Sequence, residues 1–300
     1  MSEIKPLSQE IKYVGLDVDD TLVPWLVPHV NALVKLSKYL YKQKKEVSPD
    51  EQTSEEDIIG EMSMIYEKHG TIDYTPVIQE MESFGEDKIS RKQYTDLILG
   101  GVEVFREVRD YYSPEIEGVR EMLDRLLDAK IYVFALSSAP LNKAIRRLKR
   151  HNLDSKMKLI CGVRDKIKDE RPIYVKTRAS FGSYSGKFDK KELEIKKPDT
   201  NLSEVLGISK EEVQESCVFV GNSQMEDVGL GLGNNCVAFH ADWVKFPPYF
   251  LDDLRSFSTP KLEENYVNPD PARVKAVKNY EKRYDLNHPL ELLSYLGIDK

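Results

Sequence analysis

Apolar and polar positions follow two rhythms along the chain. Short and nearly continuous apolar runs, rich in β-branched and aromatic residues, predict buried strands. These runs lie at 11–16, 131–138, 158–163, 217–221 and 236–240. Elsewhere apolar residues recur every three or four positions, which predicts amphipathic helices. From residue 113 onward such helices lie at 113–130, 141–153, 272–283 and 289–296. Strands that alternate with helices predict an α/β fold with a doubly wound parallel sheet covered on both faces.

Residues 24–113 interrupt this alternation. Segments 31–45, 55–69 and 94–112 have helical spacing, and no strand pattern lies between them. Single hydrophobic cores stop growing near ~250–300 residues, so a chain of 300 residues is expected to hold two modules. We therefore predict an α/β core formed by residues 1–23 and 114–300, with a helical domain inserted at 24–113.

Two later stretches fit neither rhythm. Residues 164–195 are too long for an ordinary connection and include Gly182, Ser183 and Gly186, which predicts a hairpin or a mobile excursion. Residues 242–275 contain five prolines and are expected to be mostly irregular.

Composition narrows the class of partner. With 40% hydrophobic and 32% charged residues the chain has the make-up of a globular protein, and its net charge of −7 should repel nucleic acid and anionic lipid. A small ligand is the favoured partner, and a phosphorylated one would need local positive charge or a metal.

The three cysteines lack metal-binding spacing and are expected to be buried thiols. The first residues lack a signal-peptide pattern and no apolar run has membrane-spanning length, so we expect a cytoplasmic protein without a membrane partner. The sequence gives no oligomeric state.

The first apolar run ends in "DVDDT" (17–21), which places Asp17, Asp19 and Asp20 within four positions. Packed carboxylates repel one another unless a cation, a shared proton or open solvent relieves them. A calcium loop is disfavoured because its sixth position would be Leu22 rather than glycine and its twelfth Pro28 rather than glutamate. A solvated acidic turn is the simpler alternative, but a buried strand leading into it argues against that.

Other strand ends also carry polar residues. Ser137 and Ser138 follow the run at 131–136, "GNSQMED" (221–227) follows the run at 217–220, and "KKPD" (196–199) offers Lys197. Because the carboxyl ends of parallel strands meet at one edge of a sheet, these residues are expected to converge there. Asp17, Asp19 and Asp227 would then form an oxygen-rich cluster of the kind that Mg²⁺ prefers.

These residues resemble the motifs of the haloacid dehalogenase superfamily, in particular its phosphatase branch with a helical cap. "DVDDT" is similar to the first motif DxDxT, and Ser137 stands where the second motif has Ser or Thr. Lys197 is similar to the lysine of the third motif, and "VFVGNSQMEDV" (218–228) to the acidic fourth motif. The resemblance covers about two thirds of the chain, and the ordered set of four motifs is far more specific than DxDxT alone.

The resemblance implies a role for each residue. Asp17 would attack phosphorus, and Asp19 would act first as general acid and then as general base. Ser137, with Ser138 as a further phosphate-binding candidate, would donate to a phosphoryl oxygen, and Lys197 would offset negative charge. Lys196 is the alternative to Lys197.

The implied metal ligands are Asp17, the backbone carbonyl of Asp19, Asp227 and Asn222. Many relatives have Asp where this chain has Asn222, and an amide oxygen brings no charge. Asp227 is favoured over Glu226 as the remaining acidic ligand, because relatives with GNS carry an acid five positions after the Asn.

Two further patterns favour ordinary interpretations. "GLGLGN" (229–234) does not join a strand directly to a helix, which a dinucleotide-binding loop requires, so it predicts a helix end and a tight connection. The basic segment 142–151 is expected to be a solvated helix face rather than a binding surface.

The expected activity is magnesium-dependent hydrolysis of a small phosphorylated metabolite, with the helical cap choosing the substrate. Dehalogenation is disfavoured because dehalogenases of this family lack an acid at the position of Asp19. A phosphomutase with the same aspartyl-phosphate, and a non-catalytic phosphate-sensing or scaffold protein, are the alternatives.

Overall fold

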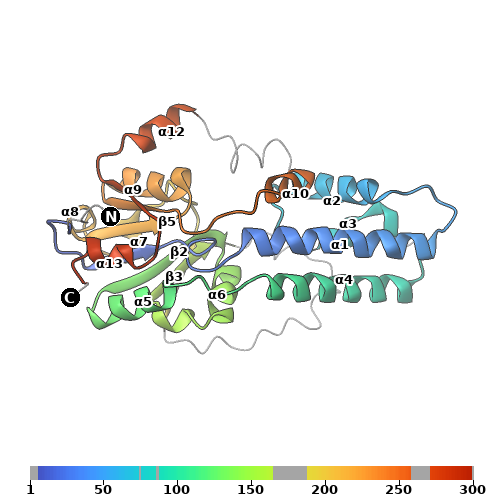
Figure 1. The fold of residues 1–300 in the computed structure, drawn as a ribbon, viewed down its shortest axis with the longest axis horizontal. Coiled ribbons are helices and arrows are strands. Elements are labelled where there is room, and N and C mark those ends of the chain that lie inside the picture. The colour runs from blue at the N-terminus through green and yellow to red at the C-terminus, as the bar shows by residue number, and fades with distance from the viewer. Residues whose placement is uncertain (1–5, 74–75, 86–87, 165–187, 258–270, 299–300) are drawn as a thin grey trace. The chain divides into compact units, whose positions relative to one another are not determined.

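A parallel β-sheet forms the centre of the α/β core. The computed structural model of this protein describes residues 6–73, 76–85, 88–164, 188–257 and 271–298. Within them the strands are β1 (Tyr13–Leu16), β2 (Tyr132–Pro140), β3 (Leu159–Val163), β4 (Asp189–Leu193), β5 (Cys217–Gly221), β6 (Val237–Ala241) and β7 (Arg283–Leu286). They pair in the order β4-β3-β2-β1-β5-β6-β7, every pair parallel. The order runs in opposite directions from β1, which confirms the predicted doubly wound sheet. Figure 1 labels β2, β3 and β5 of this sheet among the helices of the core.

Helices cover both faces of this sheet. Side chains of α5, α6 and α13 pack with one set of strand residues, and side chains of α7, α8 and α9 with the alternate set. The bounds are α5 (Val119–Asp128), α6 (Leu141–Arg150), α7 (Leu202–Leu206), α8 (Lys210–Ser216), α9 (Gly229–Asn234), α12 (Pro271–Lys278) and α13 (Glu291–Tyr295). A π-helical turn, Gln224–Val228, and a 3₁₀ turn, Asp154–Lys156, complete the core. The predicted alternation of strands and helices is therefore confirmed.

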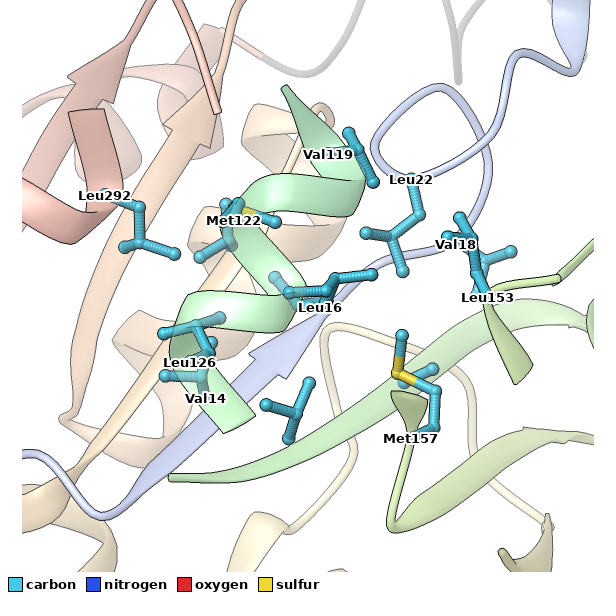
Figure 2. Packing of buried hydrophobic residues seen from close by; sticks show 14 of the residues in the cluster. Val14, Leu16, Val18, Leu22, Val119, Met122, Leu126, Leu153, Met157 and Leu292 are labelled. Carbon is cyan, nitrogen blue, oxygen red and sulfur yellow. The ribbon is translucent and has the colours of Figure 1, made fainter. Parts of the chain in front are cut away.

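One face of strand β1 packs against helix α5. Val14 and Leu16 point toward Val119, Met122 and Leu126 of α5, and all five are buried (Figure 2). Full burial of one such side chain stabilises the fold by about 1.5–3 kcal/mol.

Gly15 occupies the opposite face of β1. A Cβ at this position would lie 2.4 Å from the ring of Phe134 and 2.6 Å from that of Phe219. The glycine therefore lets two aromatic rings from the neighbouring strands close over β1, since no real Cβ approaches another atom so closely.

The two edge strands were not predicted. β4 is largely exposed and reads DKKEL, and β7 reads RYDL, so neither has the apolar pattern of the inner strands. Charged side chains are common on edge strands because they block pairing with other chains. Of the predicted excursion at 164–195, residues 189–193 form β4, and residues 165–187 lie outside the described part of the chain.

Helix α5 begins later than its sequence pattern predicted. The helix starts at Val119 rather than near residue 113, because Gly118 has a φ of 82°. This left-handed conformation cannot belong to a right-handed helix, so the residues before it form a turn.

The helical residues form a second compact unit. Its helices are α1 (Leu26–Val47), α2 (Glu55–His69), α3 (Val77–Glu80), the 3₁₀ turn Glu82–Phe84, α4 (Arg91–Tyr111) and α10 (Phe250–Phe257). Ser54 and Ser90 begin α2 and α4 with reciprocal capping boxes, in which each serine accepts from a backbone N–H three residues on. α1 contacts α4, α2 and α10 within this unit.

Contacts divide the chain into Met1–Pro24, Glu115–Lys245 and Pro271–Lys300 on one side, and Trp25–Pro114 with Phe246–Asp270 on the other. The sequence analysis had assigned 246–257 to the core, whereas α10 packs on α1 and α2 of the helical unit. The reason is that α10 has an apolar face, with Phe250, Leu254 and Phe257 buried. In the described part of the chain, no helix combines the length and the apolar character needed to cross a bilayer.

Candidate active site

The loop after β1 is anchored to the sheet at its first residue. Asp17 continues the β1–β5 ladder, with its backbone N–H donating to the carbonyl of Val220 at 2.9 Å. Asp20 then adopts a φ of 58°, and its N–H donates to Val23 at 2.7 Å, which closes a tight turn. The Asp17 side chain is thereby buried at the carboxyl end of a central strand.

Lys197 joins two of the predicted acids. Its Nζ donates to Asp17 Oδ1 at 2.5 Å and also contacts Asp227 Oδ1. All three side chains are almost completely buried, with exposed fractions of 2% for Lys197, 7% for Asp17 and 1% for Asp227. Residues from three separate loops thus meet in one cluster, although Asp17 and Lys197 are 180 positions apart in the sequence.

The charges in this cluster shift one another. Burial alone would lower the pKa of Lys197, but the negative charges of Asp17, Asp227 and Glu226 raise it above its ordinary value, so the ammonium is retained. Burial, opposed by Lys197, raises the pKa of Asp227 to about 7, with Asp17 and Glu226 adding to the rise. Three acids thus surround one lysine.

Gly221 and Ser223 hold Asp227 in place. Ser223 donates its backbone N–H to Asp227 Oδ2 at 2.8 Å, and its hydroxyl accepts from the N–H of Glu226 at 3.1 Å. A Cβ at position 221 would lie 2.3 Å from Asp227 Cγ. Only glycine therefore allows the carboxyl of Asp227 to fold back over the end of β5.

Thr21 connects Asp17 with the loop after β5. Its hydroxyl donates to Asp17 Oδ2 at 3.1 Å and accepts from the backbone N–H of Asn222 at 3.0 Å. The side-chain oxygen of Asn222 lies 3.4 Å from the same hydroxyl. Both carboxylate oxygens of Asp17 are consequently oriented, one by Lys197 and the other by Thr21.

The two serines after β2 have different partners. Ser137 is buried, and its Oγ accepts from the backbone N–H of Ala139 at 3.0 Å. Ser138 donates to Glu226 Oε2 at 2.6 Å. This contact ties the end of β2 to the fourth motif, and it engages Glu226 with Ser138, whereas Asp227 faces Asp17 through Lys197.

Asp19 does not join the cluster through its carboxylate. Its Oδ2 contacts the guanidinium Nη1 of Arg147 on α6. The sequence analysis expected the helix carrying Arg147 to present a solvated basic face, yet only 11% of this side chain is exposed. One signal could have found it: Arg147 lies three positions after the buried Ala144 and next to the buried Leu148, so it borders the apolar face.

Two further residues brace the site and were not identified from the sequence. His240 at the end of β6 places Nε2 3.1 Å from the carbonyl of Asn222, and its Nδ1 lies 3.2 Å from Asp285 Oδ1. Trp243 donates its indole N–H to the carbonyl of Thr21 at 3.0 Å. Neither residue type belongs to the four motifs, so no spacing rule pointed to them.

The donors around Asp17 fit a hard cation. Over the described ranges, no group of three or more His, Cys, Asp or Glu side chains is spaced to hold a metal. The set instead combines two carboxylates, Asp17 and Asp227, with the amide oxygen of Asn222, all of them oxygen donors. The crowding of acids around Lys197 is the condition that a divalent cation relieves.

Comparison with known proteins identifies the fold. Neither a scan of protein-family models nor a search of curated proteins finds a match. Among solved structures, the chain is similar to a 2-haloacid dehalogenase from Pseudomonas syringae pv. Tomato, with a TM-score of 0.53, 13% identity, and coverage of 96% of this chain and 98% of that one.

Two other structures agree with this result. A HAD phosphatase from Thermococcus onnurineus gives a TM-score of 0.51 at 14% identity, covering 96% and 98% of the two chains. A haloacid dehalogenase-like hydrolase from Xanthomonas campestris gives 0.50 at 14% identity, covering 97% of each. The chain therefore has the haloacid dehalogenase-like fold that its four motifs predicted.

Proposed function

We propose that this protein is a magnesium-dependent phosphatase that hydrolyses a small phosphomonoester through an aspartyl-phosphate on Asp17. The observation that carries the proposal is the contact of Lys197 with both Asp17 and Asp227 in a buried cluster at the carboxyl end of the sheet. A buried carboxylate whose two oxygens are held by Lys197 and Thr21 is oriented for attack on a bound electrophile.

The reaction has two displacements. In the first, an Asp17 oxygen bonds to phosphorus while the ester P–O bond breaks, and the carboxyl proton of Asp19 passes to the leaving oxygen. In the second, Asp19 takes a proton from water, the water oxygen bonds to phosphorus, and the Asp17–phosphorus bond breaks. Free phosphate and the ionised Asp17 are regenerated.

Lys197 and Ser137 would stabilise the transferring group. The ammonium of Lys197 already sits between two carboxylates, where it offsets the negative charge brought by a phosphoryl group. Ser137 Oγ accepts a hydrogen bond from Ala139, so its own hydrogen can be donated to a phosphoryl oxygen. Ser138, which donates to Glu226, is assigned a supporting role at the edge of the phosphate site.

Magnesium would be held by Asp17, Asp227, the backbone carbonyl of Asp19 and Asn222. When bound, the cation supplies charge neutralisation for the phosphoryl oxygens and orients them. Asn222, whose backbone N–H donates to Thr21, would contribute an uncharged oxygen. The acids near Lys197 are therefore Asp17, Asp227 and Glu226, without the fourth that an aspartate at position 222 would add.

The helical residues 24–113 are proposed to act as the cap that selects the leaving group. Their insertion directly after the first motif, and their compact packing as a separate unit, support this role. A small phosphorylated metabolite is the proposed substrate class, because the net charge of −7 disfavours nucleic acid and Lys197 supplies the local positive charge that a phosphoryl group needs.

The test is hydrolysis of 4-nitrophenyl phosphate with and without Mg²⁺, by the wild-type protein and by Asp17→Asn. We expect Mg²⁺-dependent phosphate release that is abolished by the substitution. Retained activity in Asp17→Asn would exclude the proposed nucleophile, and an inert wild-type protein would favour the non-catalytic alternative. Consumption of a sugar phosphate without release of free phosphate would identify a phosphomutase.

A further inference from the structure

Arg147 is held against the loop that carries the first motif. It lies on α6, where Ala144, Ile145 and Leu148 form the buried face. The Arg147 guanidinium contacts Asp19 Oδ2, and the two side chains have exposed fractions of 11% and 21%. The pair therefore joins the helix that follows β2 to the turn that follows β1.

This contact differs from an ordinary surface ion pair. Exposed pairs between long side chains are mobile and contribute little, whereas a largely buried guanidinium fixes a carboxylate in one orientation. Arg146 and Arg150 on the same helix are exposed, so α6 directs one of its arginines to the site. Asp19 is only two positions from Asp17, which makes its orientation relevant to the reaction.

We propose that Arg147 is a positioning residue that aims the Asp19 carboxyl at the leaving-group oxygen. The inference rests on the proposed function, in which Asp19 donates the proton to that oxygen as the ester bond breaks. Proton transfer requires heavy atoms within about 2.6–3.2 Å, so an acid on a turn is effective only when its rotamer is restricted. The contact of Arg147 Nη1 with Asp19 Oδ2 provides that restriction, and a flexible lysine ammonium would provide it less well.

The role makes a prediction about leaving groups. Phenolate needs a proton more than 4-nitrophenolate does, because phenol is the weaker acid. The two aryl phosphates are otherwise similar in size and shape. Losing the orientation of Asp19 should therefore slow hydrolysis of phenyl phosphate more than hydrolysis of 4-nitrophenyl phosphate.

The experiment measures kcat/KM for both substrates with Arg147→Met, Arg147→Lys and the matched control Arg150→Met. For Arg147→Met we expect about a tenfold loss with phenyl phosphate and less than about threefold with 4-nitrophenyl phosphate, a fraction of the ~10²–10⁴-fold that general acid–base catalysis supplies. Arg147→Lys should show the same substrate dependence to a smaller degree. It replaces Arg147→Met in the test if the methionine variant does not fold. Arg150→Met should match the wild type.

A double-mutant cycle separates positioning from structural support. In an Asp19→Asn background the carboxyl is gone, so adding Arg147→Met should have no further effect on kcat/KM. Equal losses on both substrates, or an undiminished effect in the Asp19→Asn background, would show that Arg147 only supports the fold. If the wild type hydrolyses neither substrate, the proposed function fails, whereas an active wild type with an unaffected Arg147→Met overturns this inference alone.

Discussion

Two buried lysines, one in each compact unit, show that burial of charge does not by itself mark a functional site. Lys44 in the helical unit and Lys197 in the α/β core both have side chains that are 2% exposed. Lys44 pairs with Glu51, which is 51% exposed, at 2.6 Å, and donates to the carbonyl of Ser83 at 3.1 Å. Among the described residues its acidic partner faces solvent, and the contact joins two segments of the helical unit.

Lys197 has the opposite surroundings. Its two carboxylate partners, Asp17 and Asp227, are as buried as the lysine, and Glu226 adds a third negative charge. The acids therefore outnumber the cation in a region shielded from water. Such a surplus of acids is typical of sites that bind a cation, and Lys44 lacks it.

Substitution of Lys197 should have the largest effect. Lys197→Met removes the charge that faces the phosphoryl group, and we expect kcat/KM to fall by about 10²–10³-fold, as for loss of a charge-stabilising donor. The variant should also lose about 3–5 kcal/mol of unfolding free energy, because two buried carboxylates lose their partner. Steady-state kinetics and urea denaturation measure the two effects. Activity within threefold of the wild type would remove Lys197 from the mechanism.

Lys44→Met is the matched test in the helical unit. Its expected result is a loss of about 1–3 kcal/mol of unfolding free energy, because the carbonyl of Ser83 loses its donor. The kcat of the folded protein should stay unchanged. A drop in kcat comparable with that of Lys197→Met would show that the two lysines differ less than their surroundings indicate.

Trp243→Phe tests how far the bracing of the core site extends. The change keeps the aromatic ring but removes the N–H that donates to the carbonyl of Thr21, and Thr21 orients Asp17. We expect a severalfold decrease in kcat, and about 1 kcal/mol less unfolding free energy. Thr21→Val should reduce kcat further, since it removes the direct contact with Asp17. If Trp243→Phe reduced kcat more than Thr21→Val, the proposed chain of contacts would be wrong.

The smallest expected effect is on the pH dependence of stability and concerns His151. This side chain is buried in the core but, unlike Lys197, is not surrounded by several acids. Burial lowers the pKa of His151. The positive charges of Arg150 and Arg120 lower it further, whereas the negative charge of Glu115 raises it. The unfolded chain therefore binds a proton more readily than the folded protein. The contribution of His151 to the free energy of unfolding is complete above the ordinary histidine pKa of about 6.5, and it decreases as the pH falls below that value. His151→Gln should lose less unfolding free energy between pH 7.5 and 5.5 than the wild type in paired denaturation curves.

The central part of the fold could be predicted from the sequence because inner strands leave a strong signal. Strands such as β1 and β5 are buried on both faces and are therefore continuously apolar. The edge strands β4 and β7 carry charged residues, so their pattern resembles that of a loop. Their places in the sheet depend on neighbours that are distant in sequence.

The site divides in the same way. Asp17 and Asp227 could be placed together because each follows a predicted strand end, and Lys197 because it resembles the lysine of the third motif. The structure brings the three into one cluster. Their catalytic and metal-binding roles stay predictions. Arg147 and Trp243 were missed because their contribution is made by a side chain that crosses from another element, and no local spacing encodes that crossing.

The separation of Asp17 from Lys197 by 180 positions has a consequence for biosynthesis. While the ribosome is still translating, Asp17, the proposed nucleophile, has neither Lys197 nor Asp227 beside it, since both emerge long after the helical insertion. Partial chains would carry the carboxylate but could not use it. Activity should therefore switch on only late in translation, once the strand preceding Asp227 has docked beside β1.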